Sequence, residues 1–398
     1  MSLLLLFVIF ISFIGLGIPD SVFGASWPAI YTEFGIPYTY NNFVCITVAL
    51  CTTCSSVFSH KILTKFKTGN VTAFSTLLTA AGLLGFSFAP NIYFMILFSI
   101  PLGLGAGCID SGLNNYVALH YKATHMNFLH CFYGVGVALS PFIMSFMLSG
   151  DLGWRGGYKV VFIIQLIIAV ICLFSLPLWK KVSDNTEEFT EAEKKVRLKD
   201  VVKIKGVKIG WFVFFFACGL EFTCGNWCTT FLVECLNLEK NVAAIGLTCY
   251  YAGLASGRLT AGFISTRVSP WNIIRIGLLS ICIGIALIFL PLPYVFAFIA
   301  MFLLGFGIGP IFPNLTHLTP INYGKDNSPA VVGTQMAASN LGVMAAPFIF
   351  SLLAQYVSVN VFPYYVLIIF CALICSIFLL KQSLGIYNGY KTNKQKRS

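Results

Sequence analysis

The stretch G-V-A-L-S-P-F-I-M-S at residues 136–145 recurs as G-V-M-A-A-P-F-I-F-S at residues 342–351. Two further patterns repeat in the same order. The glycines of 103–107 (G-x-G-x-G) return at 305–309, and Asp20-x-x-x-Gly24 returns as Glu221-x-x-x-Gly225. The offsets are 206, 202 and 201 residues, so the second half of the chain repeats the first. A repeat of this length predicts a molecule built from two related structural units.

Composition places both units in a membrane. The 398 residues are 58% hydrophobic and 10% charged, with a mean hydropathy of +0.85. Soluble domains carry roughly 25% charged residues, so this chain lacks the polar side chains to cover an aqueous surface. The composition excludes a water-soluble enzyme, a disordered chain and a secreted disulfide scaffold.

Apolar runs of spanning length predict twelve transmembrane helices, because one helix needs about 20 apolar residues to cross a bilayer. The predicted spans are 3–27, 39–58, 70–89, 92–118, 126–148, 156–179, 208–232, 242–263, 271–291, 293–317, 329–354 and 360–380. This pattern predicts a six-helix half at 1–179, a charged cytoplasmic linker at 180–207, a second half at 208–380 and a basic cytoplasmic tail at 381–398.

Six spans per half give the two repeats the same orientation in the membrane. We therefore expect an all-α membrane protein whose halves are related by a pseudo-twofold axis along the membrane normal. Parallel repeats of this kind are typical of alternating-access transporters, with a substrate site near the bilayer midplane between the halves.

The positive charges predict the orientation. Of the 25 Lys and Arg residues, only Arg155, Lys159 and Lys240 fall on one predicted side, which leaves 22 on the other. Cytoplasmic loops carry an excess of Lys and Arg, so both termini are predicted to be cytoplasmic in a multi-pass protein of the cell (inner or plasma) membrane. The net charge of +11 is interpreted as a topology signal and a contact for lipid headgroups, and not as a nucleic-acid surface.

Three carboxylates lie inside predicted spans, where an ionisable group costs several kcal/mol and calls for a functional explanation. They are Asp20 in span one, next to Pro19 that we expect to open the helix, Asp110 in span four and Glu221 in span seven. Loss of water favours the uncharged form of a carboxyl, so Asp20 and Asp110 are predicted to carry a coupled proton. A structural explanation stays open for each acid, as a helix cap or, for Glu221, as a hydrogen-bond hub.

Other polar side chains lie near these acids and complete a predicted substrate site. Amides, an imidazole and an indole suit a neutral polyol, because hydroxyls donate to carboxylates and accept from amides while a ring face stacks on tryptophan. His130 and Trp227 can equally be membrane-interface residues. The predicted substrate-binding residues are Asp110, Asn114, Asn115, Asn127, His130, Glu221, Asn226 and Trp227.

The cysteine and histidine patterns predict neither a metal site nor a cofactor. The 14 cysteines lie almost wholly inside spans, where small apolar side chains pack helices. Cys51 and Cys54 form a C-x-x-C pair, but a second pair or histidine cluster at zinc spacing does not accompany it.

Taken together, these residues resemble the major facilitator superfamily, and more narrowly its fucose–galactose–glucose proton symporter group. The resemblance rests on 17–20 and 24–28 in span one, 105–114 in span four, 126–130 through Pro141 in span five, and 219–227 in span seven. It implies proton-coupled uptake of a hexose or related sugar, with Asp20 tied to the proton and Asp110 to both sugar and proton. Gly257-Arg258 with Gly262 is similar to the superfamily's basic loop motif in the second half.

The sequence bears on three other functions. A proton-driven exporter of drugs or metabolites shares the fold, and Gly134-x-Gly136 with Ser140-Pro141 matches an exporter motif in part. A membrane-embedded enzyme is not predicted, because the sequence contains neither H-E-x-x-H nor G-x-S-x-G. A non-transporting nutrient sensor stays open, although its loops are short for signalling. Sodium in place of protons also stays open, and a monomer is expected.

Overall fold

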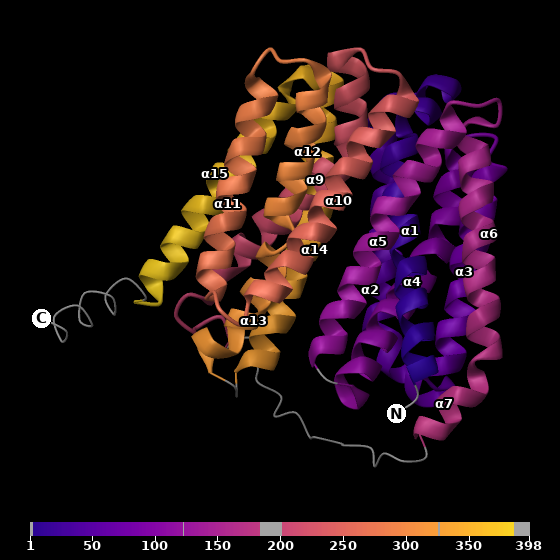
Figure 1. The fold of residues 1–398 in the computed structure, drawn as a ribbon, viewed down its shortest axis with the longest axis vertical. Coiled ribbons are helices and arrows are strands. Elements are labelled where there is room, and N and C mark those ends of the chain that lie inside the picture. Colours follow the sequence, from indigo (N-terminus) through magenta and orange to yellow (C-terminus); the bar gives the residue numbers. More distant parts are fainter. Residues whose placement is uncertain (1–2, 122, 184–200, 325–326, 386–398) are drawn as a thin grey trace, which may run out of the picture.

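The computed structural model describes residues 3–121, 123–183, 201–324 and 327–385, and the helices in these ranges form two bundles (Figure 1). The first bundle contains α1 (Leu3–Phe34), α2 (Tyr40–Phe66), α3 (Thr68–Ser87), α4 (Ile92–His120), α5 (Ala123–Leu148), α6 (Gly153–Phe174) and the short α7 (Leu176–Ser183). The second contains α9 (Val207–Leu236), α10 (Lys240–Ile264), α11 (Pro270–Phe289), α12 (Tyr294–Ile308), α13 (Ile311–Tyr323), α14 (Ser328–Tyr356) and α15 (Phe362–Ser383).

The predicted all-α membrane fold is confirmed. Eleven helical segments of the described ranges are long and apolar enough to cross a bilayer. The remaining predicted span corresponds to α10, whose window is less apolar because it contains Lys240 and Arg258 as well as several hydroxyl and glycine residues. Most of the predicted linker and tail (184–200 and 386–398) lies outside the described residues.

Several predicted boundaries need correction. The first span was predicted to end at residue 27, but α1 runs to Phe34 and is continuous through Pro19 and Pro28. Prolines are tolerated inside membrane helices because neighbouring groups satisfy the freed carbonyls, so Pro19 does not open the helix. The sixth span ends at Phe174, and α7 is a separate short helix. The tenth span consists of α12 and α13, which meet at Gly309 and Pro310.

The two bundles make equivalent helix contacts, because glycines allow close backbone approach at repeated positions. A Cβ atom at Gly136 of α5 would meet the carbonyl of Ile14 in α1, and one at Gly342 of α14 would meet the carbonyl of Phe215 in α9. These residues differ by 206 and 201, the same offsets as in the sequence repeat. The α1–α5 contact of the first half and the α9–α14 contact of the second are therefore equivalent.

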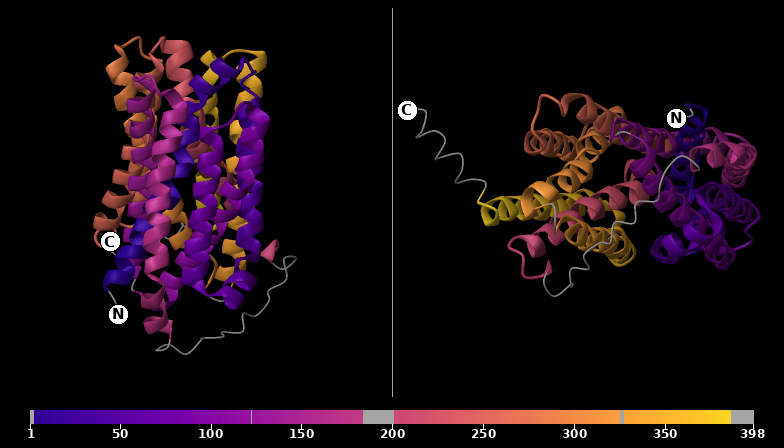
Figure 2. Two further views of the ribbon diagram at one scale, coloured as in Figure 1. Left: turned by 90° about the vertical axis from the view of Figure 1, so that its right-hand side faces the viewer. Right: turned by 90° about the horizontal axis from the view of Figure 1, so that it is seen from below.

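The halves meet mainly at one end of the molecule, here called the closed end, where α1 and α9 finish. Tyr31 donates a hydrogen bond to Glu234, and the amide of Asn42 donates to Ser351. The backbone amide of Tyr38 donates to Gln355 at 3.1 Å. At the opposite, open end, where α1 begins, the two bundles separate (Figure 1), and the view from below shows them side by side (Figure 2).

Gly24 and Gly225 bring the backbones of the two halves close together. A Cβ atom at Gly24 would lie 2.5 Å from the carbonyl oxygen of Gly225 and 3.4 Å from the Cα of Asn226. These two glycines are counterparts in the sequence repeat. The α1–α9 crossing therefore brings equivalent points of the two halves into backbone contact.

Candidate functional site

A cavity of about 430 Å³ lies between the halves, beyond the closed-end contacts. Its wall comes from α1 to α6 of the first half and from α9, α10, α13 and α14 of the second. Most of the lining is apolar, which is usual for a small-molecule site, and a few polar groups converge on it. Among the polar lining residues are Asp20, Asn42, Asp110, His130, Tyr133, Glu221, Asn226, Arg258, Ser339 and Asn340.

Asp20 lines this cavity from the middle of α1. The Tyr133 hydroxyl of α5 donates a hydrogen bond of 2.7 Å to Asp20 Oδ2. The Asp20 side chain is exposed to the cavity although α1 itself is deeply embedded. The carboxyl therefore has a neutral partner within its own half and a free path to water or substrate.

Asp110 lines the same cavity from α4. It accepts a hydrogen bond of 2.8 Å from the Asn114 amide, which lies one helical turn further along. This confirms the predicted geometry in which the two side chains share a helix face. Asn115 and Asn127 were predicted to join them, but their side chains lie outside the described residues.

Glu221 of α9 forms an ion pair with Arg258 of α10. Arg258 Nη2 lies 3.0 Å from Glu221 Oε1, and Arg258 Nε donates to the Gly309 carbonyl at 3.2 Å. Only 13% of the Arg258 side chain and 15% of the Glu221 side chain are exposed. One oxygen of Glu221 is thus committed to the guanidinium, which limits the role predicted for it as a substrate ligand.

His130 and Asn226 also face the cavity. The His130 ring of α5 lies edge-on to Phe13, with 6.0 Å between ring centroids, and its side chain is exposed. The Asn226 amide approaches Cys45 Sγ across the two halves, at 3.8 Å. Both residues lie where a bound molecule would touch helices of the two halves together.

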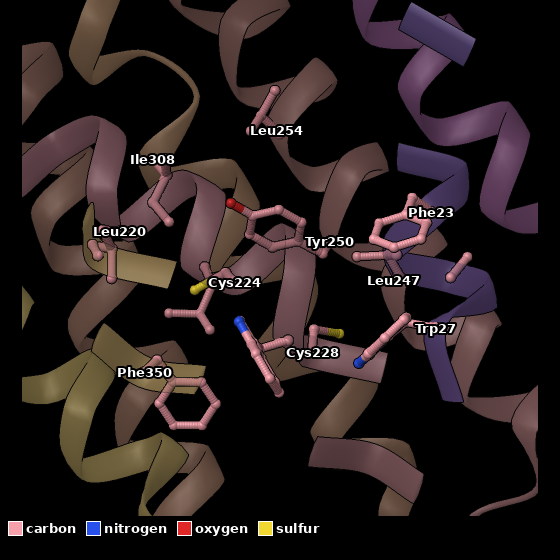
Figure 3. Packing of buried hydrophobic residues seen from close by; sticks show 14 of the residues in the cluster. Phe23, Trp27, Leu220, Cys224, Cys228, Leu247, Tyr250, Leu254, Ile308 and Phe350 are labelled. Atoms are coloured by element: carbon pink, nitrogen blue, oxygen red, sulfur yellow. The ribbon is translucent and has the colours of Figure 1, made fainter. Parts of the chain in front are cut away.

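Trp227 was predicted to stack on substrate, but it is absent from the cavity wall among the described residues. Its side chain is 0% exposed and contacts Phe350 edge-on, with 5.0 Å between ring centroids. Phe350 belongs to the same buried cluster as Cys224, Cys228 and Tyr250 (Figure 3). The preceding residue, Asn226, takes the cavity-facing position of this helical turn, so the next residue points into the core of the second half.

Replacing Trp227 with alanine should therefore lower stability and leave substrate affinity of the folded protein unchanged. Removal of a buried tryptophan costs about 3–5 kcal/mol, so the thermal midpoint of the purified protein should fall clearly. Phe350→Ala, which removes the contacting ring, should act in the same direction. An unchanged thermal midpoint together with weakened substrate binding would contradict the packing role and assign Trp227 to the substrate site.

Arg258 and Tyr133 were missed as site residues from the sequence. Arg258 was assigned to the cytoplasmic side and to a loop motif because it lies near the end of its predicted span. The structure places it inside α10 and on the cavity wall. A usable signal was present, because an arginine and a glutamate inside neighbouring spans are expected to pair. Tyr133 carried no comparable signal, since a tyrosine is common in such helices.

Comparison with known proteins agrees with this architecture. The Major Facilitator Superfamily profile matches residues 5–347, and the chain belongs to that family. It is a multi-pass membrane transporter and not an enzyme.

Three relatives are similar at low identity. "Bypass of stop codon protein 6" of Saccharomyces cerevisiae is 24% identical over 94% of this chain and 80% of its own length. The glucose/mannose transporter GlcP of Bacillus subtilis is 24% identical over 56% of each chain. A homologue of the multi-drug resistance efflux pump PmrA from Lactococcus lactis is 23% identical over 69% of this chain and 68% of its own.

Two solved structures share the fold. The nucleoside transporter NupG superposes with a TM-score of 0.75 at 13% identity, covering 96% of this chain and 100% of that one. A bacterial homologue of the human lysosomal transporter Spinster, in an inward-facing and occupied conformation, gives 0.72 at 12% identity, covering 95% and 96%. At these identities the likeness establishes the fold alone.

Proposed function

We propose that this protein is a secondary active transporter that couples uptake of a hexose or related sugar to protons by alternating access. The observation that carries the proposal is the pair of carboxylates, Asp20 and Asp110, exposed to one cavity between the halves. A relative that is a glucose/mannose transporter supports the substrate class. With both termini in the cytoplasm, the open end faces inward.

The two carboxylates are proposed to have different tasks. Asp110 with Asn114 offers acceptors and donors for sugar hydroxyls, and His130 and Asn226 extend this surface across the cavity. Asp20 is proposed to carry the proton, because its partner Tyr133 is neutral and leaves the charge uncompensated. A proton-driven exporter would use the same two acids, and an efflux-pump homologue is among the relatives.

The direct test uses purified protein in proteoliposomes, with a panel of hexoses and deoxyhexoses and a pH electrode in the medium. Sugar-dependent alkalinisation is expected for proton symport and would identify the substrate class. If none of the sugars changes the pH of the medium, although the protein is folded and monodisperse, sugar–proton symport is contradicted. Repeating the panel with a sodium gradient in place of the proton gradient distinguishes the coupling ion.

Asp110→Ala should weaken substrate binding. It removes both acceptor oxygens and leaves the Asn114 amide without its 2.8 Å partner. Loss of hydrogen bonds to a charged acceptor costs about 1.5–3 kcal/mol, so the dissociation constant should rise roughly 10- to 100-fold. Calorimetry or equilibrium binding on the purified protein measures this. Asp151→Ala, at an exposed loop acid, is the matched control, and an unchanged affinity in Asp110→Ala would remove Asp110 from the site.

A further inference from the structure

Asp20 and Glu221 occupy equivalent positions in the two repeats but have different partners. Both lie four residues before the glycines that touch at the α1–α9 crossing. Asp20 accepts a hydrogen bond from the neutral Tyr133 hydroxyl, whereas Glu221 is paired with the Arg258 guanidinium. The acid of the second half is therefore neutralised in place, and the acid of the first half is not.

Both acids line a small space of about 10 Å³ between the halves, which is about the minimum that holds one water molecule. This space is lined by Asp20 and Tyr133 from the first half and by Glu221 and Tyr251 from the second. Arg258 lines the larger cavity together with Asp20 and lies within electrostatic range of Tyr133. Asp20 and Asp110 line the same cavity as the guanidinium, and Asp20 is the one of these two acids that shares the small space with Glu221.

Arg258 is anchored at a repeated backbone position. Its Nε binds the Gly309 carbonyl at 3.2 Å, and the Ser56 hydroxyl binds the Gly107 carbonyl, also at 3.2 Å. Both residue pairs are related by 202 positions, the offset of the glycine repeat. The second half thus carries a cation where the first half carries a neutral hydroxyl. That cation is anchored at the α10–α12 contact through Nε, while its terminal Nη2 binds the Glu221 carboxylate.

We propose that Glu221 is a positioning residue for proton coupling, which holds Arg258 away from Asp20 so that a proton, and not the guanidinium, neutralises Asp20. This inference rests on the proposed function. One proton binds a carboxylate oxygen of Asp20 and later leaves the same oxygen, while the ion pair of the second half stays intact. The other titratable groups around the acids are Asp110, His130, Tyr133, Tyr158, Tyr250, Tyr251, Cys45, Cys218 and Cys224.

Charge counting gives a sharp test. In Glu221→Gln, the released Arg258 balances Asp20, and transport no longer needs a proton. In the double variant Glu221→Gln/Arg258→Gln, Asp20 again lacks a cation, and the proton requirement returns. A merely structural ion pair predicts a different result. Glu221→Gln would then lower stability or total transport through the unpaired buried charge of Arg258 and the double variant would recover both, but the ratio of protons to sugar would stay at the wild-type value in each.

The experiment measures protons and radiolabelled sugar taken up in the same proteoliposomes, and reports their ratio. An ion pair near Asp20 is worth at least tenfold in proton occupancy at an effective dielectric of about 20, so the ratio should fall about tenfold or more in Glu221→Gln. The double variant should recover to within about twofold of wild type, a non-additivity expected only for coupled residues. Glu239→Gln and Arg267→Gln, at exposed positions on and beyond the ends of α10, are matched controls.

The possible outcomes separate failure of this inference from failure of the proposed function. Wild-type protein that moves no protons with sugar would overturn both. Wild-type coupling with an unchanged ratio in Glu221→Gln, or an uncoupled double variant, would overturn this inference alone. Arg258→Gln serves where Glu221→Gln is too unstable to purify. It leaves Asp20 without a nearby cation, so coupling should persist, and its loss would also refute the role of Glu221.

Discussion

Asp20→Asn should abolish uphill transport while downhill exchange of substrate continues. Asparagine preserves the shape of the side chain and can still accept the Tyr133 hydrogen bond of 2.7 Å, but it cannot bind and release a proton. A potential of 100 mV supplies about 2.3 kcal/mol per charge, enough for roughly a 50-fold concentration gradient. The variant should lose this entire gradient.

The measurement compares accumulation of labelled sugar against a gradient with counterflow between preloaded vesicles. Asp151→Asn, an amide replacement at an exposed loop acid, should accumulate sugar like wild type. Accumulation in Asp20→Asn at the wild-type level would show that the proton is carried elsewhere. Loss of counterflow as well as accumulation would assign Asp20 to substrate binding.

Gly24→Val should hold the closed end open. A Cβ at Gly24 meets the carbonyl oxygen of Gly225 at 2.5 Å, and the obstacle is backbone that a rotamer change cannot move away. Overpacking costs about 1–3 kcal/mol and occasionally more, and about 5.5 kcal/mol inverts a population from 99:1 to 1:99. A cost of about 1–3 kcal/mol changes the ratio of the two states roughly 5- to 150-fold, so the valine should shift the population towards separation at the α1–α9 crossing and slow net transport by a similar factor.

Distances between spin labels at Leu152 and Leu292, in closed-end loops of the two halves, would report this state. Labels introduced on genetically encoded amino acids avoid the 14 native cysteines. The distance distribution should move to longer values in Gly24→Val. Gly333→Val, at a helical glycine with open space around it, is the matched control. An unchanged distribution with normal transport would show that the Gly24 contact is dispensable.

The fold could be predicted from the sequence largely because hydropathy and repetition are long-range signals. Twelve apolar runs and three repeated motifs are each insensitive to the position of any one side chain. The predicted helix boundaries were wrong where they depend on how the backbone behaves at a single proline or glycine. Pro19 was expected to open α1, yet the helix is continuous. The tenth span is divided at Gly309 and Pro310, which apolar composition alone does not reveal.

The candidate site could be predicted only in part, for a physical reason. A carboxylate inside a membrane span is conspicuous because its insertion is costly, and Asp20, Asp110 and Glu221 all line the cavity. An arginine near a span end is ambiguous, since its long side chain also serves as a topology signal. Trp227 shows what hydrophobic periodicity leaves undecided. Successive residues of an α-helix point about 100° apart, so Asn226 and Trp227 cannot share one direction, and periodicity does not say which of the two faces a cavity.

The equal backbone bonds of Ser56 and Arg258 have an evolutionary meaning. After an ancestral unit was doubled, the two copies kept the same skeleton and diverged in the chemistry attached to it. Because the two copies have the same orientation in the membrane, exchanging them does not turn one end state into the other, and the doubling alone gives both halves the same chemistry. A hydroxyl in one copy and a cation in the other made the halves chemically different while their backbones stayed alike. The acid of the first half could therefore acquire a task that its counterpart in the second half does not share.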